Sequence, residues 1–401
     1  MVPAFSAAQV VVVVVYASVV AGVTLPTPMY VDFQQRWSLT HAEVTALYAL
    51  YPVGVLVVLL GAAHWSDDIG RRPVMAIALG CSAGSSVLFL VADSFVVASI
   101  ARVLTGVASG FMVNAANAAL VELAPSGHRR SASILSTAVN QIGLGLGALA
   151  AALLVQYGPA PTRLTFACHL GAMLLAAALS FTVPETVAAR RTRPRLRLQP
   201  LGLPPGRRAE FLGASFAAFA AFALCGLLAS LAPSIVREQL GSDHALLGGG
   251  AGALVFVVSG ATQPFWARRR DTGALLVGSG LLVSGLVVMT YGLSAGSVSL
   301  FLTGVAIGGA AVGALFMTTL MRVNLLVGDA SRARTTGTYL FITFSGLILP
   351  TLGTGFAADR LTQLQATVLF STLTGLVTLG SLGLLLMGEH RRSARVDLSR
   401  R

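Results

Sequence analysis

The sequence has few charged residues and no lysine. Only 10% of its 401 residues are charged, whereas a soluble domain carries roughly 25%. A water-exposed globule of this length is therefore excluded. All 27 basic residues are arginine, and the formal net charge is +12. This charge does not indicate a nucleic-acid partner, because the arginines lie between hydrophobic segments, where membrane topology selection places them.

Cysteine is also scarce. Cys81, Cys168 and Cys225 each lie inside an apolar segment, and their spacing matches neither a disulfide framework nor a metal-binding knuckle. We therefore expect no metal and no cofactor. A nucleotide-binding loop of the form G-x4-G-K-[ST] is absent as well. An enzyme or sensor embedded in the membrane is only a remote alternative, since no nucleophile with a base is found among the apolar segments.

Hydrophobic residues dominate the chain. They make up 55% of the sequence, and the mean hydropathy is +0.80. A membrane-spanning helix needs about 20 consecutive apolar residues. The sequence therefore predicts an all-α membrane protein with twelve spanning helices, at residues 7–29, 42–64, 74–93, 95–121, 131–156, 163–183, 211–236, 245–267, 273–294, 297–321, 335–357 and 363–387.

The arginines predict the orientation of these helices. Arg102 lies within a predicted helix, 22 arginines lie on one side, and only four lie on the other: Arg36, Arg163, Arg237 and Arg360. By the positive-inside rule, both termini are expected in the cytoplasm. The use of arginine in place of lysine is typical of a GC-rich bacterial genome, so we expect the bacterial plasma (inner) membrane.

One long loop, at residues 184–210, divides the predicted helices. It contains five prolines and seven arginines, a composition too polar and too rich in proline for another span. The sequence L-T-G-V-A at 104–108 returns at 302–306. Parallel six-helix repeats with a substrate between them are a known transporter architecture. The repeat and the linker therefore predict two six-helix bundles, 1–183 and 211–387, and a cytoplasmic tail, 388–401.

The loop after the second predicted helix reads A-H-W-S-D-D-I-G-R-R-P from Ala63. It resembles the signature loop of the major facilitator superfamily, G-x-L-x-D-R-x-G-R-[RK], with matches at Asp67, Gly70, Arg71 and Arg72. The resemblance implies that these residues clamp the inner side of the two bundles in the outward-open state. Physically, a carboxylate beside paired guanidinium groups forms ion pairs that can break and re-form. A solvated loop whose arginines only set the topology is the alternative.

Two further helices are similar to motifs of this family. Arg102, followed by Gly106 and Gly110, resembles its buried basic residue with spaced glycines. An ionised group inside a membrane is costly and marks a functional site, so Arg102 is a candidate coupling residue; the alternative is that it snorkels to the head groups. In the fifth predicted helix, Gly143 and Gly147 resemble an antiporter motif, although this spacing also permits close helix packing in any membrane protein.

Two other titratable residues are candidates for proton coupling. His169 lies in the sixth predicted helix, and Asp32 lies at the outer end of the first. Histidine titrates near neutral pH and can relay protons. A packing role for His169 and an ordinary loop position for Asp32 are the alternatives. No carboxylate lies in the middle of a predicted helix, which weighs against proton coupling.

Polar and aromatic residues outline the expected cavity. The resemblance implies that such residues on helices 1, 2, 4, 5, 7, 8, 10 and 11 line it. The candidates are Tyr48, Tyr51, Asn114, Asn117, Asn140, Gln141, Phe219, Phe222, Gln263, Met317, Met321, Asn324, Phe341 and Phe344. This mostly apolar set suits a neutral or amphipathic organic solute.

The favoured hypothesis is an alternating-access transporter that exports a drug-like or metabolite solute in exchange for protons. Its partners would be the small-molecule substrate, the lipid bilayer and protons, with no nucleic acid, and a monomer would be sufficient. An uptake symporter or uniporter for a small nutrient is the alternative. The sequence does not name the substrate, the coupling ion or the direction.

Overall fold

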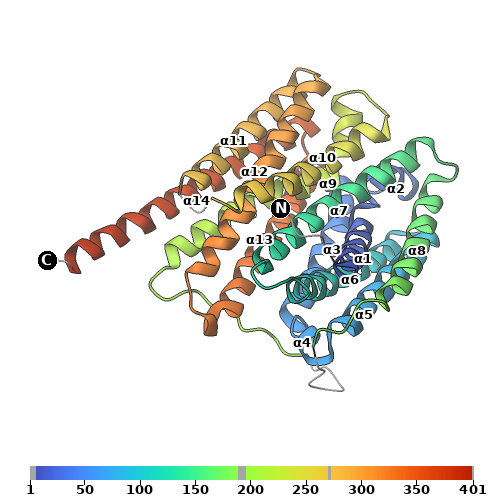
Figure 1. Cartoon of the computed structure of the whole chain (residues 1–401). Coiled ribbons are helices and arrows are strands. Elements are labelled where there is room, and N and C mark those ends of the chain that lie inside the picture. The colour runs from blue at the N-terminus through green and yellow to red at the C-terminus, as the bar shows by residue number, and fades with distance from the viewer. Residues whose placement is uncertain (1–5, 188–195, 270–271, 400–401) are drawn as a thin grey trace.

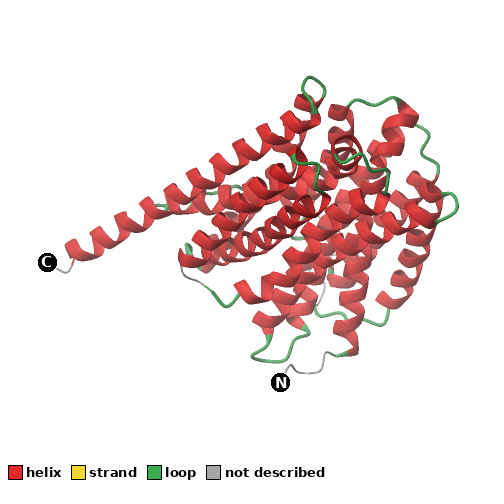
Figure 2. Cartoon of the chain, turned by 90° about the horizontal axis from the view of Figure 1, so that it is seen from above, coloured by secondary structure: helices red, strands yellow, loops and turns green. Residues whose placement is uncertain are grey.

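The structure is a computed structural model that describes residues 6–187, 196–269 and 272–399. Within these residues every regular element is a helix (Figure 2). Twelve of the helices are long and apolar enough to cross a membrane. The prediction of an all-α membrane protein with twelve spanning helices is therefore confirmed. Helices suit this environment because every backbone polar group finds its partner inside the same segment.

The first eight helices form what we call the N-half. They are α1 (Ala7–Thr24), α2 (Tyr30–Trp37), α3 (His41–Gly61), α4 (Trp65–Ile69), α5 (Arg71–Leu90), α6 (Phe95–Glu122), α7 (Arg129–Tyr157) and α8 (Pro161–Ser180). The C-half consists of α9 (Arg208–Gln239), α10 (Ala245–Trp266), α11 (Thr272–Ser294), α12 (Val298–Leu325), α13 (Asp329–Ala358) and α14 (Gln363–Ser399). Figure 1 shows the two halves side by side, with α14 extending away from the bundle toward the C-terminus.

The first spanning segment differs from its prediction. The sequence predicts one helix over 7–29, but α1 ends at Thr24 and a short 3-10 helix, η1, covers Thr27–Met29 before α2 begins. Pro26 and Pro28 lie at this break. Proline has no backbone N–H and so cannot donate within an α-helix. The helical path then resumes in α2, beyond the predicted end.

The boundaries at the linker and at the tail are also shifted. The helix α9 begins inside the predicted linker 184–210, where Arg207 pairs with Glu210 across its first turn at 2.9 Å. A carboxylate in the first turn stabilises a helix through the macrodipole. The helix α14 continues into the predicted tail 388–401. Residues 188–195 of the linker and 400–401 of the tail lie outside the described residues.

Two helix pairs make the most extensive contacts between the halves: α7 packs along α10, and α3 packs along α13. Small residues allow the close approach of the first pair. A Cβ at Gly145 would lie 2.9 Å from the Ala253 carbonyl oxygen, and one at Gly260 would lie 3.1 Å from the Ala138 carbonyl oxygen. The halves therefore meet along two seams, with space between the seams.

The arginine-bearing helix ends lie together on one face, which we call the arginine-rich face. Arg322 at the end of α12 pairs with Glu210 at the start of α9 at 3.0 Å. Arg130 at the start of α7 donates to the Ala267 carbonyl after α10 at 2.6 Å. We call the other end of the spanning helices the opposite face.

Candidate functional site

A cavity of about 290 Å³ lies between the two halves. Its walls come from α1, α3, α6 and α7 of the N-half and from α9, α10, α12 and α13 of the C-half. None of its lining residues, as the described part of the chain defines them, is charged. The lining extends from mid-helix positions such as Tyr16 to Asn117, Ser133 and Asn324, close to the arginine-rich ends. The cavity therefore leads toward the arginine-rich face.

The N-half supplies most of the polar side chains of the cavity. On α7 these residues recur at the spacing of one helix face: Ser133, Ser136, Thr137, Asn140 and Gln141. On α6 they are Ser109, Asn114 and Asn117. The Gln141 amide donates to Ser259 Oγ of α10 at 3.0 Å. This wall presents amide and hydroxyl groups to a solute.

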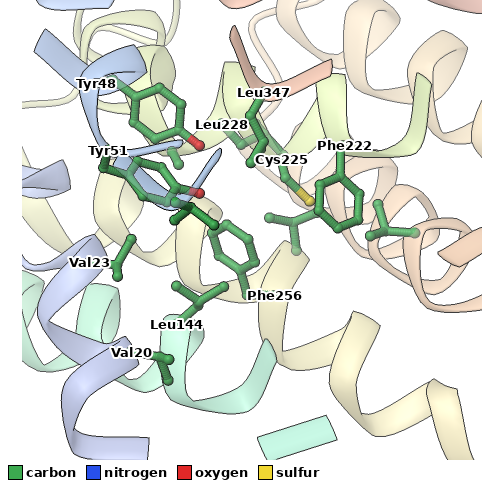
Figure 3. Close-up of a cluster of buried hydrophobic side chains, with 14 of the residues drawn as sticks. Val20, Val23, Tyr48, Tyr51, Leu144, Phe222, Cys225, Leu228, Phe256 and Leu347 are labelled. Carbon is green, nitrogen blue, oxygen red and sulfur yellow. The ribbon is translucent and has the colours of Figure 1, made fainter. Parts of the chain in front are cut away.

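The C-half supplies an aromatic wall. The ring of Phe222 lies 5.1 Å from that of Phe316 and 5.8 Å from that of Phe344, measured between centroids. This wall also contains one amide residue, Asn324, and one hydroxyl residue, Thr336. The Thr336 hydroxyl donates a hydrogen bond to Asn324 Oδ1 at 2.8 Å. Figure 3 shows Phe222, Cys225 and Phe256 of the C-half near Tyr51 and Leu144 of the N-half. The cavity is thus amphipathic, with a polar wall and an apolar wall.

The halves are joined at the opposite face. The Asp359 carboxylate, at the end of α13, accepts from the backbone N–H of His41 at 2.7 Å and of Ala42 at 3.1 Å. Gln156 at the end of α7 accepts from the Ala245 backbone N–H at 2.8 Å. These contacts close the end of the cavity that faces away from the arginines.

Arg102 is fully buried beside the cavity, with 0% of its surface exposed. Its guanidinium donates to the Val23 carbonyl at 2.6 Å and to the Tyr48 carbonyl at 3.3 Å. It also lies 4.9 Å from the ring centroid of Tyr51, which lines the cavity. The alternative in which Arg102 snorkels to the head groups is therefore wrong. Among the described residues, no carboxylate forms a salt bridge with it.

The signature loop forms an ion-pair network within the N-half. Arg71 pairs with Asp67 at 2.6 Å and with Glu122 at the end of α6 at 2.7 Å. Both are charge-assisted hydrogen bonds, which are stronger than neutral ones. The loop is therefore an ordered part of the fold. The alternative in which its arginines are only solvated topology signals does not describe Arg71, which is buried.

A third carboxylate completes this network. Glu185, which follows α8, accepts from the backbone N–H groups of Arg71 at 2.8 Å and Arg72 at 3.0 Å. It thereby satisfies two of the unpaired donors at the start of α5. Gly70 has φ +103°, and a Cβ there would lie 2.7 Å from the Glu185 carboxylate. Only glycine fits this position without strain.

His169 and Asp32 both lie outside the cavity lining. The ring of His169 bonds to Ser86 Oγ at 2.7 Å and to the Ser18 carbonyl at 3.1 Å. It thereby holds α8 against α5 and α1. Asp32 lies on α2, at the opposite face. A role for either residue in proton coupling stays a prediction.

The four motif glycines lie at close helix contacts. A Cβ at Gly106 would meet the Tyr51 carbonyl oxygen, and one at Gly110 would lie 2.8 Å from Val58 Cβ. On α7, Cβ atoms at Gly143 and Gly147 would lie 3.1 Å from the Ala17 carbonyl oxygen and 2.7 Å from the Ala21 carbonyl carbon. These contacts support the packing explanation for the glycines.

Comparisons with known proteins agree with this geometry. The profile of the Major Facilitator Superfamily matches residues 11–351. The chain belongs to this superfamily. It is therefore a membrane transporter and not an enzyme, and members of the superfamily bind small molecules within the membrane. A search among curated proteins found no match.

Solved transporters of the superfamily share the fold. A bacterial homologue of the human lysosomal transporter Spinster, inward-facing and unoccupied, is 16% identical with a TM-score of 0.62, and the match covers 97% of this chain and 96% of that one. The human organic anion transporter MFSD10 is 17% identical with a TM-score of 0.63, covering 95% and 100%. A point mutant of the nucleoside transporter NupG is 13% identical with a TM-score of 0.68, covering 94% and 98%.

Eight of the predicted cavity residues line the cavity of this superfamily member. They are Tyr51, Asn114, Asn117, Asn140, Gln141, Phe222, Asn324 and Phe344. Six lie elsewhere: Tyr48, Phe219, Gln263, Met317, Met321 and Phe341. Tyr48 is turned toward Arg102, and Met317 packs with Trp266. The rotation of each helix about its axis, which residue type alone does not reveal, decides this difference.

Several lining residues are absent from the predicted set. They are hydroxyl-bearing residues and apolar residues: Tyr16, Ser109, Ser133, Ser136, Thr137, Cys225, Phe256, Phe316 and Thr336. The polar residues of α7 recur with a helical period, so this one wall could have been found in the sequence. For metal binding, the described residues contain no group of three or more His, Cys, Asp or Glu suited to an ion.

Proposed function

We propose that this transporter exports a small uncharged or amphipathic organic solute from a bacterial cytoplasm, in exchange for protons. The observation that carries the proposal is the uncharged cavity with one amide-rich wall and one aromatic wall. A cavity of this kind favours neutral solutes with an apolar face, because a buried charge would find no counter-charge there. Neighbours named as transporters of organic anions and nucleosides support an organic cargo.

Alternating access would proceed by rocking of the bundles 1–183 and 211–387 about this cavity. With the arginine-rich face in the cytoplasm, as the positive-inside rule favours, the cavity leads inward and the opposite face is the outer one. The transition to an outward-open state then requires the outer contacts to separate. The signature loop with Asp67 and Arg71 would brace the inner side in that state.

Arg102 is the proposed coupling residue. It is the buried charge nearest the cavity, through its contact with Tyr51, and a change in solute occupancy at Tyr51 would reach it directly. The uncharged lining also keeps a second candidate open, namely uptake or uniport without protons. A proton-coupled mechanism usually places a titratable group in the pathway.

Everted membrane vesicles with an acidified interior test the proposal. Lipophilic cations, neutral antibiotics and sugars are added singly while a pH-sensitive dye reports the gradient. We expect a neutral or amphipathic compound to discharge the gradient in wild type and not in Arg102→Ala. Arg163→Ala, which alters an exposed arginine of α8, serves as the matched control and should behave as wild type.

Two other outcomes of the vesicle assay would contradict parts of the proposal. If no compound discharges the gradient, proton-linked export is contradicted, and counterflow of labelled nutrients then tests uptake and uniport. Discharge by Arg102→Ala at the wild-type rate would remove Arg102 from the coupling mechanism.

A further inference from the structure

A histidine lies between two carboxylates where the halves meet at the outer face. His41 begins α3 of the N-half, whereas Glu238 and Asp359 end α9 and α13 of the C-half. The imidazole Nε2 lies 3.1 Å from Glu238 Oε1, and Nδ1 lies 3.3 Å from Asp359 Oδ1. We call these three residues the outer gate.

The outer gate fits an imidazolium and not a neutral imidazole. A neutral ring has one N–H donor and one acceptor nitrogen, whereas the protonated ring donates from both. With a carboxylate oxygen at each nitrogen, the neutral ring would turn a lone pair toward an anion. Because His41 donates at both sides only when it carries a proton, proton binding and closure of the gate stabilise each other.

The ring can exchange its proton with water. The side chain of His41 is 19% exposed, and that of Glu238 is 42% exposed. An unperturbed histidine titrates at about pH 6.5, within the range that a bacterium meets outside the cell. Protons from the solution on the outer side can therefore reach the ring.

Other charged groups near this end of α3 are engaged elsewhere or lie farther from the ring. On the neighbouring α9, Arg237 pairs with Asp243 at 3.1 Å, and on α13 the neighbouring Arg360 donates to its own helix. On α3 itself, Glu43 accepts from the Thr40 backbone N–H at 2.8 Å. The helix α2 contributes Asp32 and Arg36. Of the described carboxylates, only those of Glu238 and Asp359 lie within 4 Å of the ring nitrogens.

The geometry points to a proton-binding site at the outer gate that favours the inward-facing state when it is occupied. Opening the outer face separates His41 from both carboxylates, which removes the reason for the ring to hold its proton. The proton enters from the outer solution and returns to it when the gate opens. The site thus biases the cycle by external pH without carrying charge across the membrane. This inference rests on the orientation and alternating access proposed above, but not on the solute or on proton exchange.

Distance measurements between the halves test the inference. Cys81→Ser, Cys168→Ser and Cys225→Ala remove the native thiols, and spin labels are placed at Tyr157→Cys and Leu361→Cys, two exposed residues near the outer ends of α7 and α13. The full-length protein in lipid nanodiscs is examined by pulsed electron resonance from about pH 5 to about pH 8. We expect the ratio of long to short distances to rise about fivefold or more with pH.

Two glutamine variants decide the role of His41. His41→Gln should give distances that do not change with pH, whereas His244→Gln, an exposed histidine of the same face, should titrate as the labelled parent does. A parent that does not respond to pH, or His41→Gln with the full response, would overturn the inference.

If His41→Gln does not fold, Glu238→Gln replaces it. Loss of one negative acceptor should move the transition to lower pH, and an unmoved transition would contradict the site. These distance measurements use neither solute nor gradient. They can therefore contradict the outer gate while the vesicle assay supports proton-linked export, and they can support the outer gate while the vesicle assay contradicts export.

Discussion

Gln141 of α7 donates a hydrogen bond of 3.0 Å to Ser259 of α10, across the boundary between the two halves. Both side chains are buried, and Gln141 also lines the cavity. The Asn140 amide in turn lies 3.4 Å from the Gln141 oxygen. The hydrogen bond between Gln141 and Ser259 therefore does two things. It links α7 to α10 across the boundary between the halves, and it orients a side chain of the polar wall.

Removal of this bond should lower stability measurably. Ser259→Ala leaves a buried amide donor without its partner, at a cost of about 1–3 kcal/mol. We expect a lower apparent Tm for Ser259→Ala and for Gln141→Leu, and a double variant that loses less than the sum of the two. Ser284→Ala, which alters an exposed serine of α11, should leave Tm unchanged. Additive losses would show that the two residues act independently.

The Arg102 site should not accept lysine. The guanidinium reaches two carbonyl groups and covers the Tyr51 ring at once, whereas an ammonium is a point charge without a planar face. We expect Arg102→Lys to reduce solute-driven proton flux about tenfold or more despite the retained charge. Flux is measured per amount of monodisperse protein. Wild-type flux would mean that charge alone is required.

Gly70 should tolerate a side chain less well than Gly127. Both have positive φ, +103° and +89°, but only at Gly70 would a Cβ meet another group, the Glu185 carboxylate. A left-handed conformation costs an L-residue roughly 1–2 kcal/mol. Gly127→Ala should lose about this amount, and Gly70→Ala should lose more, because Glu185 is also displaced from the start of α5. Equal shifts in thermal unfolding would contradict the role of Glu185.

Phe222 should contribute directly to solute affinity. It lies at the centre of the aromatic wall, between Phe316 and Phe344. Loss of an aromatic contact costs about 0.5–1.5 kcal/mol beyond the lost area, so we expect Phe222→Ala to weaken binding about tenfold. Binding of the solute found in the vesicle assay is followed by calorimetry. Phe216→Ala, on the exposed side of α9, should bind as wild type does.

The sequence by itself determined the membrane character of this protein and its twelve spanning helices. This follows because the bilayer accepts only segments that satisfy their own backbone hydrogen bonds, so length and apolar composition are sufficient to identify them. It also identified the signature loop, where Asp67, Gly70 and Arg71 lie within five residues and act locally. It also identified Arg102 as a charge inside an apolar run, but burial in the protein and snorkelling to the head groups both stayed open until the structure showed the side chain to be buried.

Only the tertiary structure decided which side chains meet. Glu122 and Glu185 join Arg71 from distant helix ends, and His41 meets Asp359 from the other half of the chain. Gln141 lines the cavity while Gln263 does not, although both are amides inside apolar helices. Hydropathy shows that a helix lies in the membrane, but it does not show how the helix is rotated about its own axis. That rotation is set by glycine contacts such as Gly147 against Ala21, which form only when the helices pack.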